Sequence, residues 1–385
     1  MSEKYSVIIV GAGAMGCSIA YHLTQLGAEG VCIVDKEATP GCGSTGKANG
    51  GIRAQFTTRA NVALSLKSME ILDELAPKFG EPPLYHKIGY LFMTADEESV
   101  QEMAGAVSWQ RKMGASVELL DGDEVRRLAT YVDGADIVGG TFGERDGLID
   151  PGRLTNWFFS AARKMGAEAK FYTEVTSLER EPSGDFRVGT ASGELFAPVV
   201  VNAAGPYAAS IAAKIGVELP VLPVRRHSLV TGPCVGPPDT IPMTIDADSG
   251  LVIRREGPAI IIAYANPEEP PGFNETFDRD FVEKIAGPLE RRFPAVAEAG
   301  IDFRKSWVGH YAVSPDHNAI LGLVPGVEGF YLANGFSGHG AMHSPAVGLC
   351  LAELIARGRS ESVDIAPFGL ERFKLGRAAK EAYVL

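Results

Sequence analysis

The sequence has 385 residues, of which 36 are basic and 48 acidic, so its formal net charge is −12. Hydrophobic residues make up 45% and charged residues 22%, a globular composition that excludes disordered, fibrous and small disulfide-rich chains. The length predicts two or three domains. The acidic balance and the absence of a lysine- or arginine-rich block argue against a nucleic acid or an anionic membrane as partner.

No stretch approaches the roughly 18 apolar residues of a membrane span, and a strand pattern stands near the N-terminus where a signal peptide would lie. We therefore expect a cytoplasmic protein. The five cysteines, which are widely spaced and form no C-x-x-C pair, are expected to be buried thiols: Cys17, Cys32, Cys42, Cys234 and Cys350. No histidine pair has metal-ligand spacing, so we expect no metal site.

A βαβ unit of about 30 residues opens the sequence. The apolar run Val7–Val10 is too short for a helix and predicts a buried parallel strand. Helical periodicity follows from Ala14 to Leu26, and Val31–Val34 predicts a second strand that ends at Asp35.

Between the first strand and the helix lies the motif G-x-G-x-x-G. Gly11 permits a tight turn, Gly13 lets the backbone approach a pyrophosphate, and Gly16 lets the helix pack closely on the strand. The phosphates would sit at the positive end of the helix, while Asp35 would accept hydrogen bonds from a ribose. The pattern indicates a dinucleotide site, with a purely structural turn as the alternative.

Both NAD and FAD use this unit, so a second glycine-rich loop over residues 41–51 is informative. NADP is disfavoured because Asp35 would repel its 2′-phosphate, although Lys36 weakens that argument. The small and hydroxyl-bearing residues of the loop could lie against a flavin or diphosphate. A flexible loop without a ligand would have a similar composition.

The remaining elements suggest that the chain crosses between two domains more than once. In chain order we expect a helix over 59–75, a strand over 88–93, a helix over 97–113, a helix from Pro151 to Met165, strands near Phe171 and Val175, a buried strand over 199–202, an antiparallel sheet within 221–304, and a strand, glycine turn and helix over 329–357.

Five motifs in this order resemble the D-amino-acid oxidase superfamily of FAD enzymes: the N-terminal unit, Ser44–Arg53, Val201–Gly205, Trp307–Asp316 and Gly335–Gly340. The resemblance runs from Ser6 to about Phe373. Within the superfamily the chain looks most similar to sarcosine oxidases and the catalytic (beta) subunit of archaeal proline dehydrogenase.

The resemblance implies an α/β fold in which a discontinuous Rossmann-like FAD domain joins an α+β substrate domain with a mixed, largely antiparallel sheet. The expected FAD domain comprises residues 1–81, 146–218 and 305–385. The expected substrate domain comprises residues 82–145 and 219–304. A helix beginning near Ala341 would direct its positive end at the edge of the flavin where negative charge accumulates on reduction.

The resemblance also implies the residues that bind FAD. They are Gly11, Gly13, Ala14, Met15, Gly16, Asp35, Lys36, Ser44, Thr45, Ala48, Asn49, Gly50, Val175, Ala203, Ala204, Gly205, Gly309, Phe336, Gly338, His339, Gly340, Ala341 and Met342. Gly309 stands where monomeric sarcosine oxidases have the cysteine that tethers FAD, so we expect the cofactor to be non-covalent.

Two residues are expected to act on the substrate. Arg53 matches the arginine that clamps the substrate carboxylate in sarcosine oxidases, and the alternative is a surface ion pair. Tyr311 corresponds to a family tyrosine near the substrate, and the alternative is a core aromatic residue. We expect His339 to serve the flavin through its backbone, with proton transfer as the alternative. At most one of Arg254 and Arg255 can face the substrate, since neighbouring strand residues point to opposite faces.

Three further side chains are expected to pack and not to catalyse: His227, His343 and Cys42. Met342 replaces a lysine that binds the substrate carboxylate in sarcosine oxidases, and Ile261 falls near a lysine that promotes reaction with oxygen. We therefore predict slower reoxidation by O₂ than in a dedicated oxidase.

The resulting hypothesis is FAD-dependent oxidation of the C–N bond of a small, secondary amino acid such as sarcosine or proline. The reduced flavin would pass its electrons to O₂ or to another electron acceptor. Oxidation of glycine or a D-amino acid is one alternative, although Tyr311 stands where glycine oxidases carry an arginine. An FAD-binding assembly or electron-transfer subunit with little activity alone is another. A hydrolase is disfavoured because no G-x-S-x-G motif occurs. A partner subunit or a homo-oligomer is left open.

Overall fold

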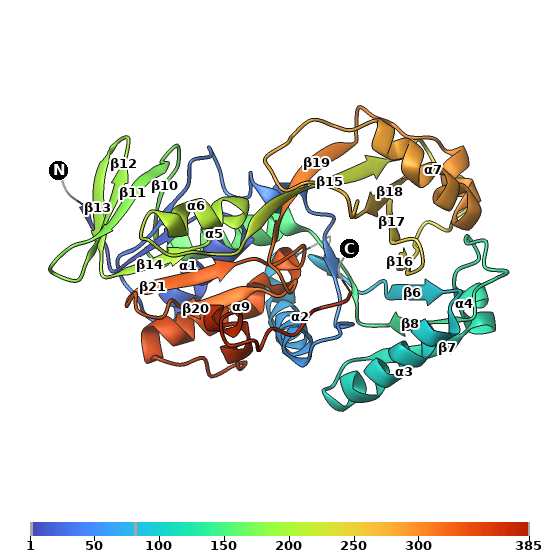
Figure 1. Cartoon of the computed structure of the whole chain (residues 1–385), viewed down its shortest axis with the longest axis horizontal. Coiled ribbons are helices and arrows are strands. Elements are labelled where there is room, and N and C mark those ends of the chain that lie inside the picture. The colour runs from blue at the N-terminus through green and yellow to red at the C-terminus, as the bar shows by residue number, and fades with distance from the viewer. Residues whose placement is uncertain (1–2, 81–82, 384–385) are drawn as a thin grey trace.

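The computed structural model describes residues 3–80 and 83–383. A six-stranded sheet with the strand order β10-β3-β2-β14-β21-β20 forms the centre of one domain (Figure 1). Its strands are parallel except at the edge, where β20 runs antiparallel to β21. The strands span Glu168–Lys170 (β10), Val31–Val34 (β3), Val7–Val10 (β2), Val199–Asn202 (β14), Phe330–Asn334 (β21) and Ile320–Leu323 (β20).

Alternate residues of β2 explain why the sheet is covered on both faces. Val7 and Ile9 pack with four helices, whereas Ile8 and Val10 pack with a small four-stranded sheet and α6. The helices are α1 (Ala14–Gln25), α2 (Arg59–Phe79), α5 (Pro151–Lys164) and α9 (Gly340–Arg357), and α6 spans Ala208–Ala213. The small sheet contains β1 (Glu3–Lys4), β13 (Gly193–Ala197), β12 (Phe186–Thr190) and β11 (Val175–Arg180).

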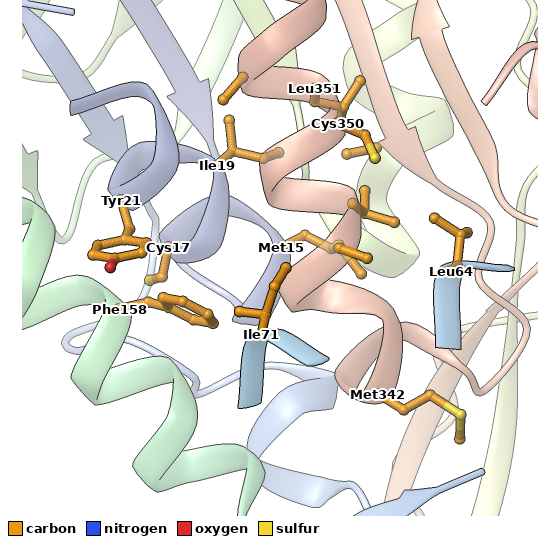
Figure 2. Packing of buried hydrophobic residues seen from close by; sticks show 14 of the residues in the cluster. Met15, Cys17, Ile19, Tyr21, Leu64, Ile71, Phe158, Met342, Cys350 and Leu351 are labelled. Atoms are coloured by element: carbon orange, nitrogen blue, oxygen red, sulfur yellow. The ribbon is translucent and has the colours of Figure 1, made fainter. Parts of the chain in front are cut away.

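The helical side of the core brings segments together that lie far apart in the sequence (Figure 2). Met15 and Ile19 of α1 pack with Leu64 of α2, Phe158 of α5 and Leu351 of α9. Because α9 lies against α1, the C-terminal part of the chain completes the core around the N-terminal βαβ unit.

The second domain is built on an eight-stranded sheet with the order β19-β15-β18-β17-β16-β6-β8-β7. All neighbours are antiparallel except β16 and β6, which confirms the expected mixed, largely antiparallel sheet. Its strands are Trp307–Val313 (β19), Leu222–Val230 (β15), Ala259–Tyr264 (β18), Leu251–Glu256 (β17), Met243–Asp246 (β16), Tyr90–Thr94 (β6), Gly139–Gly143 (β8) and Val117–Asp121 (β7).

Helices cover both faces of this sheet. Residues of α7 (Asp280–Arg292) pack with Leu91 and Met93 of β6, whereas Met103 of α3 (Glu97–Lys112) packs with Tyr90 and Phe92 on the opposite face of that strand. Two short helices, α4 (Gly122–Leu128) and α8 (Pro294–Glu298), pack with α7 on the same apolar cluster. β19 belongs to this sheet although it lies in the segment 305–385, which was expected in the FAD domain, because it pairs along β15.

A three-stranded sheet connects the two domains. It contains β4 (Gly51–Ile52), β9 (Gly147–Ile149) and β5 (Tyr85–His86), and β4 leads directly into Arg53. Four short 3₁₀ helices complete the described elements: η1 (Ser44–Lys47), η2 (Gly205–Tyr207), η3 (Ala366–Phe368) and η4 (Leu370–Arg372). Within residues 3–80 and 83–383, no helix is long and apolar enough to cross a membrane.

Local sequence signals explain several element ends. The side chain of Asp150 accepts a hydrogen bond from the backbone N–H of Arg153, and Pro151 takes the first position of α5. Asp121 and Glu124 form a reciprocal capping box at the start of α4. Cys42 corrects one expectation, because it is exposed on the second glycine-rich loop, whereas the other four cysteines are buried.

Candidate functional site

A cavity of about 600 Å³ runs between the carboxyl ends of β2, β3, β14 and β21 and one face of the eight-stranded sheet. Every residue that the sequence predicted for cofactor or substrate lines this cavity, except Gly16. In open parallel sheets, ligands bind at the carboxyl ends of the strands, where the connecting loops diverge.

The three glycines of the first turn have different geometric requirements. Gly11 has φ +112°, and a Cβ there would lie 2.4 Å from the carbonyl oxygen of Ala203. A Cβ at Gly16 would lie 1.8 Å from the carbonyl oxygen of Gly11, which accounts for its packing role outside the cavity. A Cβ at Gly13 would meet only the hydroxyl of Thr45, at 3.2 Å. The space above Gly13 can therefore hold a phosphate group.

The acidic residue after β3 is oriented by backbone groups. Asp35 accepts hydrogen bonds from the N–H of Ala12 at 2.6 Å and from the N–H of Glu37 at 2.9 Å. The ammonium of Lys36 lies 3.6 Å from the ring centroid of Tyr207, which also lines the cavity. This end of the cavity has the residue types that bind a ribose and an adenine.

The second glycine-rich loop is fixed to both domains. Thr45 accepts a hydrogen bond from the N–H of Ala14 at 3.1 Å, and Ser44 donates to the carbonyl of His310 at 2.6 Å. From the eight-stranded sheet, Ser228 donates to Asn49 at 3.0 Å. These contacts distinguish the loop from a free surface loop and hold its backbone along the cavity wall.

The turn before α9 is closely packed against β19. Ser337 and Gly338 have φ values of +50° and +104°, and Ser337 donates its N–H to the carbonyl of Ala312 at 2.9 Å. A Cβ at Gly338 would lie 2.5 Å from the ring of Tyr311. The turn can therefore pack against this tyrosine only with glycine at position 338. The turn leaves the first residues of α9, from Gly340 to Met342, along the cavity.

A cavity with this dinucleotide turn at one end and a second fixed loop along its wall suits a long cofactor. The model of the FAD dependent oxidoreductase (DAO) family matches residues 6–354. The chain belongs to this family.

Relatives of this FAD-dependent oxidoreductase include proteins named for amino-acid oxidation. The chain is 33% identical to FAD-dependent oxidoreductase domain-containing protein 1 of Xenopus laevis, covering 96% of this chain and 83% of the relative. It is 27% identical to the mitochondrial dimethylglycine dehydrogenase of Mus musculus, covering 92% of this chain but only 43% of the relative. The crystal structure of L-proline dehydrogenase from P. horikoshii matches with a TM-score of 0.90 and 29% identity, covering 98% of this chain and 99% of that one.

The cofactor of the family fits the residues present. The open space at Gly13 and the N-terminus of α1 suit the pyrophosphate, Asp35 suits the ribose, and the loop Ser44–Gly50 with the start of α9 suits the flavin. FAD is therefore the cofactor of this oxidoreductase.

Arg53 is buried at the other end of the cavity, with 1% of its surface exposed. Its Nη1 donates to the carbonyl of Gln55, its Nη2 donates to the carbonyl of Tyr383, and its Cζ lies 3.9 Å from the centroid of the Phe56 ring. Its buried Nε has no hydrogen-bond partner within the described residues. This placement excludes the surface ion pair that was the alternative.

The segment that follows Arg53 is anchored by a buried carboxylate. Asp146 accepts hydrogen bonds from the N–H of Ala54 and from Nε2 of Gln55, both at 2.8 Å. Burial raises the pKa of Asp146 to about 6, although these hydrogen bonds and the charge of Arg53 oppose that rise. The carboxylate thus fixes the backbone at Ala54 and the side chain of Gln55, next to Arg53.

Tyr311 and Tyr90 form aromatic walls near Arg53. Burial raises the pKa of Tyr311, while the neighbouring charges of Arg226 and Arg53 act in the opposite direction. Burial likewise raises the pKa of Tyr90, whose ring centroid lies 6.0 Å from the guanidinium of Arg53. Both phenols are therefore neutral at physiological pH.

A segment near the C-terminus packs against Arg53, a contact that no sequence pattern predicted. Glu381 is fully buried and accepts hydrogen bonds from the N–H groups of Thr57 and Thr58, at 2.8 and 3.0 Å. It also accepts a hydrogen bond from Nδ2 of Asn61 at 3.1 Å. Tyr383 stacks on Phe92 with ring centroids 5.0 Å apart.

The histidines near the cavity are held by packing. Burial and the charge of Arg53 set the pKa of His339 well below its usual value, so the ring is neutral. His343 is buried and shares a hydrogen bond of 2.9 Å with Ser65. His227 stacks on Phe281, with ring centroids 4.8 Å apart. His343 packs outside the cavity lining, as expected, whereas His227 packs on Phe281 and also lines the cavity.

The remaining candidates for the substrate site lie on β17 and β18, and none of them lines the cavity. Arg254 and Arg255 of β17 point to opposite faces, and neither lines the cavity; Ile261 does not line it either. Lys47, which the sequence argument did not consider, does line it and lies 3.9 Å from Glu275. Within the described residues, no cluster of three or more His, Cys, Asp or Glu side chains could hold a metal ion.

Sequence reasoning missed several cavity-lining residues: Lys47, Tyr90, Arg226, Ser228, Met243, Val252 and Ala263. The period-2 alternation of β15 could have placed Arg226 and Ser228 on one face of a strand. No local signal could have shown that this face borders the cofactor.

Proposed function

We propose that this FAD-dependent oxidoreductase oxidises the C–N bond of a small secondary amino acid, such as sarcosine or proline. The supporting observation is the buried guanidinium of Arg53, which lines the cavity beside Tyr311 and has an unpartnered Nε. A planar guanidinium fork in a secluded site is suited to a carboxylate. Dimethylglycine and L-proline, after which two of the relatives are named, both carry a carboxylate and an alkylated amine.

The chemistry divides between cofactor and chain. Bound FAD supplies the acceptor for the hydride that leaves the α-carbon. As that C–H bond breaks with its electron pair, the nitrogen lone pair forms the C=N bond, and water then hydrolyses the imine. The nitrogen must therefore be uncharged when hydride leaves.

The residues of this chain would bind the carboxylate, orient the α-carbon and exclude water. Arg53 would fix one end of the substrate, and the rings of Tyr90 and Tyr311 would enclose it. The positive charge of Arg53 also lowers the pKa of an amine held close to it, which favours the reactive neutral form.

The test is an anaerobic screen of the purified holoenzyme. Sarcosine, L-proline, D-proline, glycine and N-methylated amino acids are added in turn, and flavin absorbance is followed. We expect bleaching by secondary amino acids and little bleaching by glycine. Bleaching by glycine or a D-amino acid alone would favour the corresponding oxidase, and a flavin that no amine reduces would favour a non-catalytic subunit.

A further inference from the structure

Two adjacent arginines of β15 have opposite environments. Arg225 is buried and paired with Glu269 through two contacts, Nε to Oε1 at 2.8 Å and Nη2 to Oε2 at 3.0 Å. Arg226 has no such partner: its Nη1 donates only to the carbonyl of Arg225, and its buried Nε has no partner within the described residues. A buried donor without a partner is costly unless a ligand satisfies it.

The register of the sheet explains where Arg226 points. Arg226 pairs with Gly309 and Ser228 pairs with Ala263, and all four residues line the cavity. Side chains at alternate positions of a strand share one face, so Arg226 and Ser228 face the cavity while Arg225 faces away.

Arg226 therefore shares the Tyr311 end of the cavity with Arg53. Its Cζ lies 5.3 Å from the centroid of the Tyr311 ring, and the charges of Arg226 and Arg53 both act on this tyrosine. The guanidinium groups of Arg226 and Arg53 thus place two positive charges at the Tyr311 end of the cavity.

The carboxylates whose charges act on this pair do not line the cavity: they are Asp146 and Glu381 for Arg53, and Glu269, which is already paired with Arg225, for Arg226. The acidic residues that line the cavity are Asp35, Glu37, Glu174 and Glu275. Asp35, Glu37 and Glu174 belong to the nucleotide end, and Glu275 pairs with Lys47. The Tyr311 end of the cavity thus presents two guanidinium groups and no carboxylate in its described lining, which suits a ligand that carries two negative charges.

We propose that Arg226 is a second carboxylate-binding residue, and that the substrate is an N-carboxyalkyl amino acid, a secondary amine that carries two carboxylates. Arg53 binds one carboxylate and Arg226 binds the other, which holds the nitrogen and the α-carbon between them. This inference rests on the proposed function, because it specifies the substrate of the same cavity. Among secondary amino acids it favours those with a second carboxylate, which sarcosine and proline lack.

The experiment compares diacids with matched monoacids on the holoenzyme. Iminodiacetate, N-(2-carboxyethyl)glycine and N-(3-carboxypropyl)glycine are each paired with the analogue whose second carboxylate is a neutral carboxamide. Anaerobic stopped-flow measures the rate constant for flavin reduction divided by the Kd. We expect the wild-type enzyme to prefer at least one diacid over its amide by about tenfold or more.

Three variants connect the preference to Arg226. Arg226→Gln should bring the diacid-to-amide ratio close to one, and Arg226→Lys, which keeps the charge without the fork, should retain part of it. Arg254→Gln is the matched control, since Arg254 also has a buried Nε without a partner but does not line the cavity. It should keep the wild-type ratio.

The outcomes separate this inference from the proposed function. A wild-type ratio within threefold for every pair, or an unchanged ratio in both Arg226 variants, overturns the role of Arg226. An equal loss for diacids and amides together with a shifted flavin potential would assign Arg226 to the flavin, and also overturns it. If no amine reduces the flavin but diacids perturb its spectrum through Arg226, the binding inference stands and the proposed oxidation fails.

Discussion

The Nη2 atom of Arg53 donates a hydrogen bond to the backbone carbonyl of Tyr383, which lies 330 positions further along the chain. A neutral carbonyl fixes the guanidinium without cancelling its charge. The unpartnered Nε is left for an anion. The segment around Tyr383 therefore orients a binding group and does not occupy it fully.

Arg53→Met should abolish efficient substrate reduction while FAD stays bound. Loss of a charge-assisted contact to a carboxylate in a secluded site costs about 2–5 kcal/mol, or on the order of 30- to several-thousand-fold in kcat/KM. Anaerobic reduction kinetics and the flavin spectrum provide the two measurements. A variant within threefold of wild type for every carboxylate substrate would contradict the clamp.

Glu381→Gln should destabilise the fold by about 2–4 kcal/mol, because an amide nitrogen replaces one of the oxygens that accept hydrogen bonds from Thr57, Thr58 and Asn61. We also expect KM to rise more than kcat falls. Glu381 anchors the segment that contains Tyr383, and the carbonyl of Tyr383 accepts a hydrogen bond from Arg53. Urea unfolding and steady-state kinetics test this, with the exposed Glu371→Gln as control. Equal stability of the two variants would show that the buried carboxylate contributes little.

Gly13→Ala should fold and lose FAD. The added methyl group would enter the space expected for the pyrophosphate and meets only the Thr45 hydroxyl, so the apoprotein has room for it. We expect the Kd for FAD to rise at least about tenfold, which corresponds to a loss of about 1.4 kcal/mol in binding free energy. Gly105→Ala in α3 is the control, because its Cβ meets nothing within 4 Å.

The measurement for these two variants is FAD released into the supernatant by acid precipitation. Release from the wild type also tests non-covalent attachment, and yellow colour that stays in the wild-type pellet would contradict it. FAD retention by Gly13→Ala equal to that of Gly105→Ala would show that the phosphates lie elsewhere.

Asp146 should give the wild type a pH dependence that Asp146→Asn lacks. Its pKa is about 6 in the folded protein and near 3.8 when unfolded, so the folded state binds the proton more tightly between these values. The stability from this group is present below about pH 4 and is lost as pH rises through about 6, a change of about 3 kcal/mol.

The difference between the unfolding free energies of wild type and Asp146→Asn, measured by urea at several pH values, isolates this group. The wild-type value should fall relative to the variant between about pH 4 and 6. A parallel course of the two curves would show that Asp146 titrates normally.

Lys47→Met should slow reoxidation of the reduced flavin by O₂ by about tenfold, because a fixed cation stabilises the superoxide that forms first. The absence of a lysine near Ile261 predicts a slow reaction with O₂. Lys47, from another segment, nevertheless places a cation in the cavity wall. Stopped-flow mixing with O₂, beside an artificial dye as acceptor, separates a specific oxygen effect from general damage. Equal slowing with both acceptors would contradict it.

The local parts of the fold could be predicted because short-range rules determine them. The strand Val7–Val10 and the helix from Ala14 follow from apolar patterning and the glycine turn, and their bounds agree with the structure within one residue. The resemblance located Arg53 and Tyr311, and both line the cavity. What each does to a substrate stays a prediction.

The missed residues depend on pairings between distant segments. Arg226 faces the cavity because β15 pairs with β19 and β18, and no pattern within 222–230 tells which face is covered by a cofactor. The position of Glu381 depends on the start of α2, more than 300 residues earlier. Burial of a carboxylate there is not visible from composition, since charged residues are usually exposed.

The strand order of the six-stranded sheet also constrains how the chain folds during synthesis. β2 lies between β3 and β14, but β14 is translated about 190 residues after β2, and β21 follows β14 only after the whole eight-stranded sheet has been made. Until then one edge of the βαβ unit has unpaired backbone groups. We therefore expect a nascent chain that depends on chaperones and acquires protease resistance only after α9 leaves the ribosome.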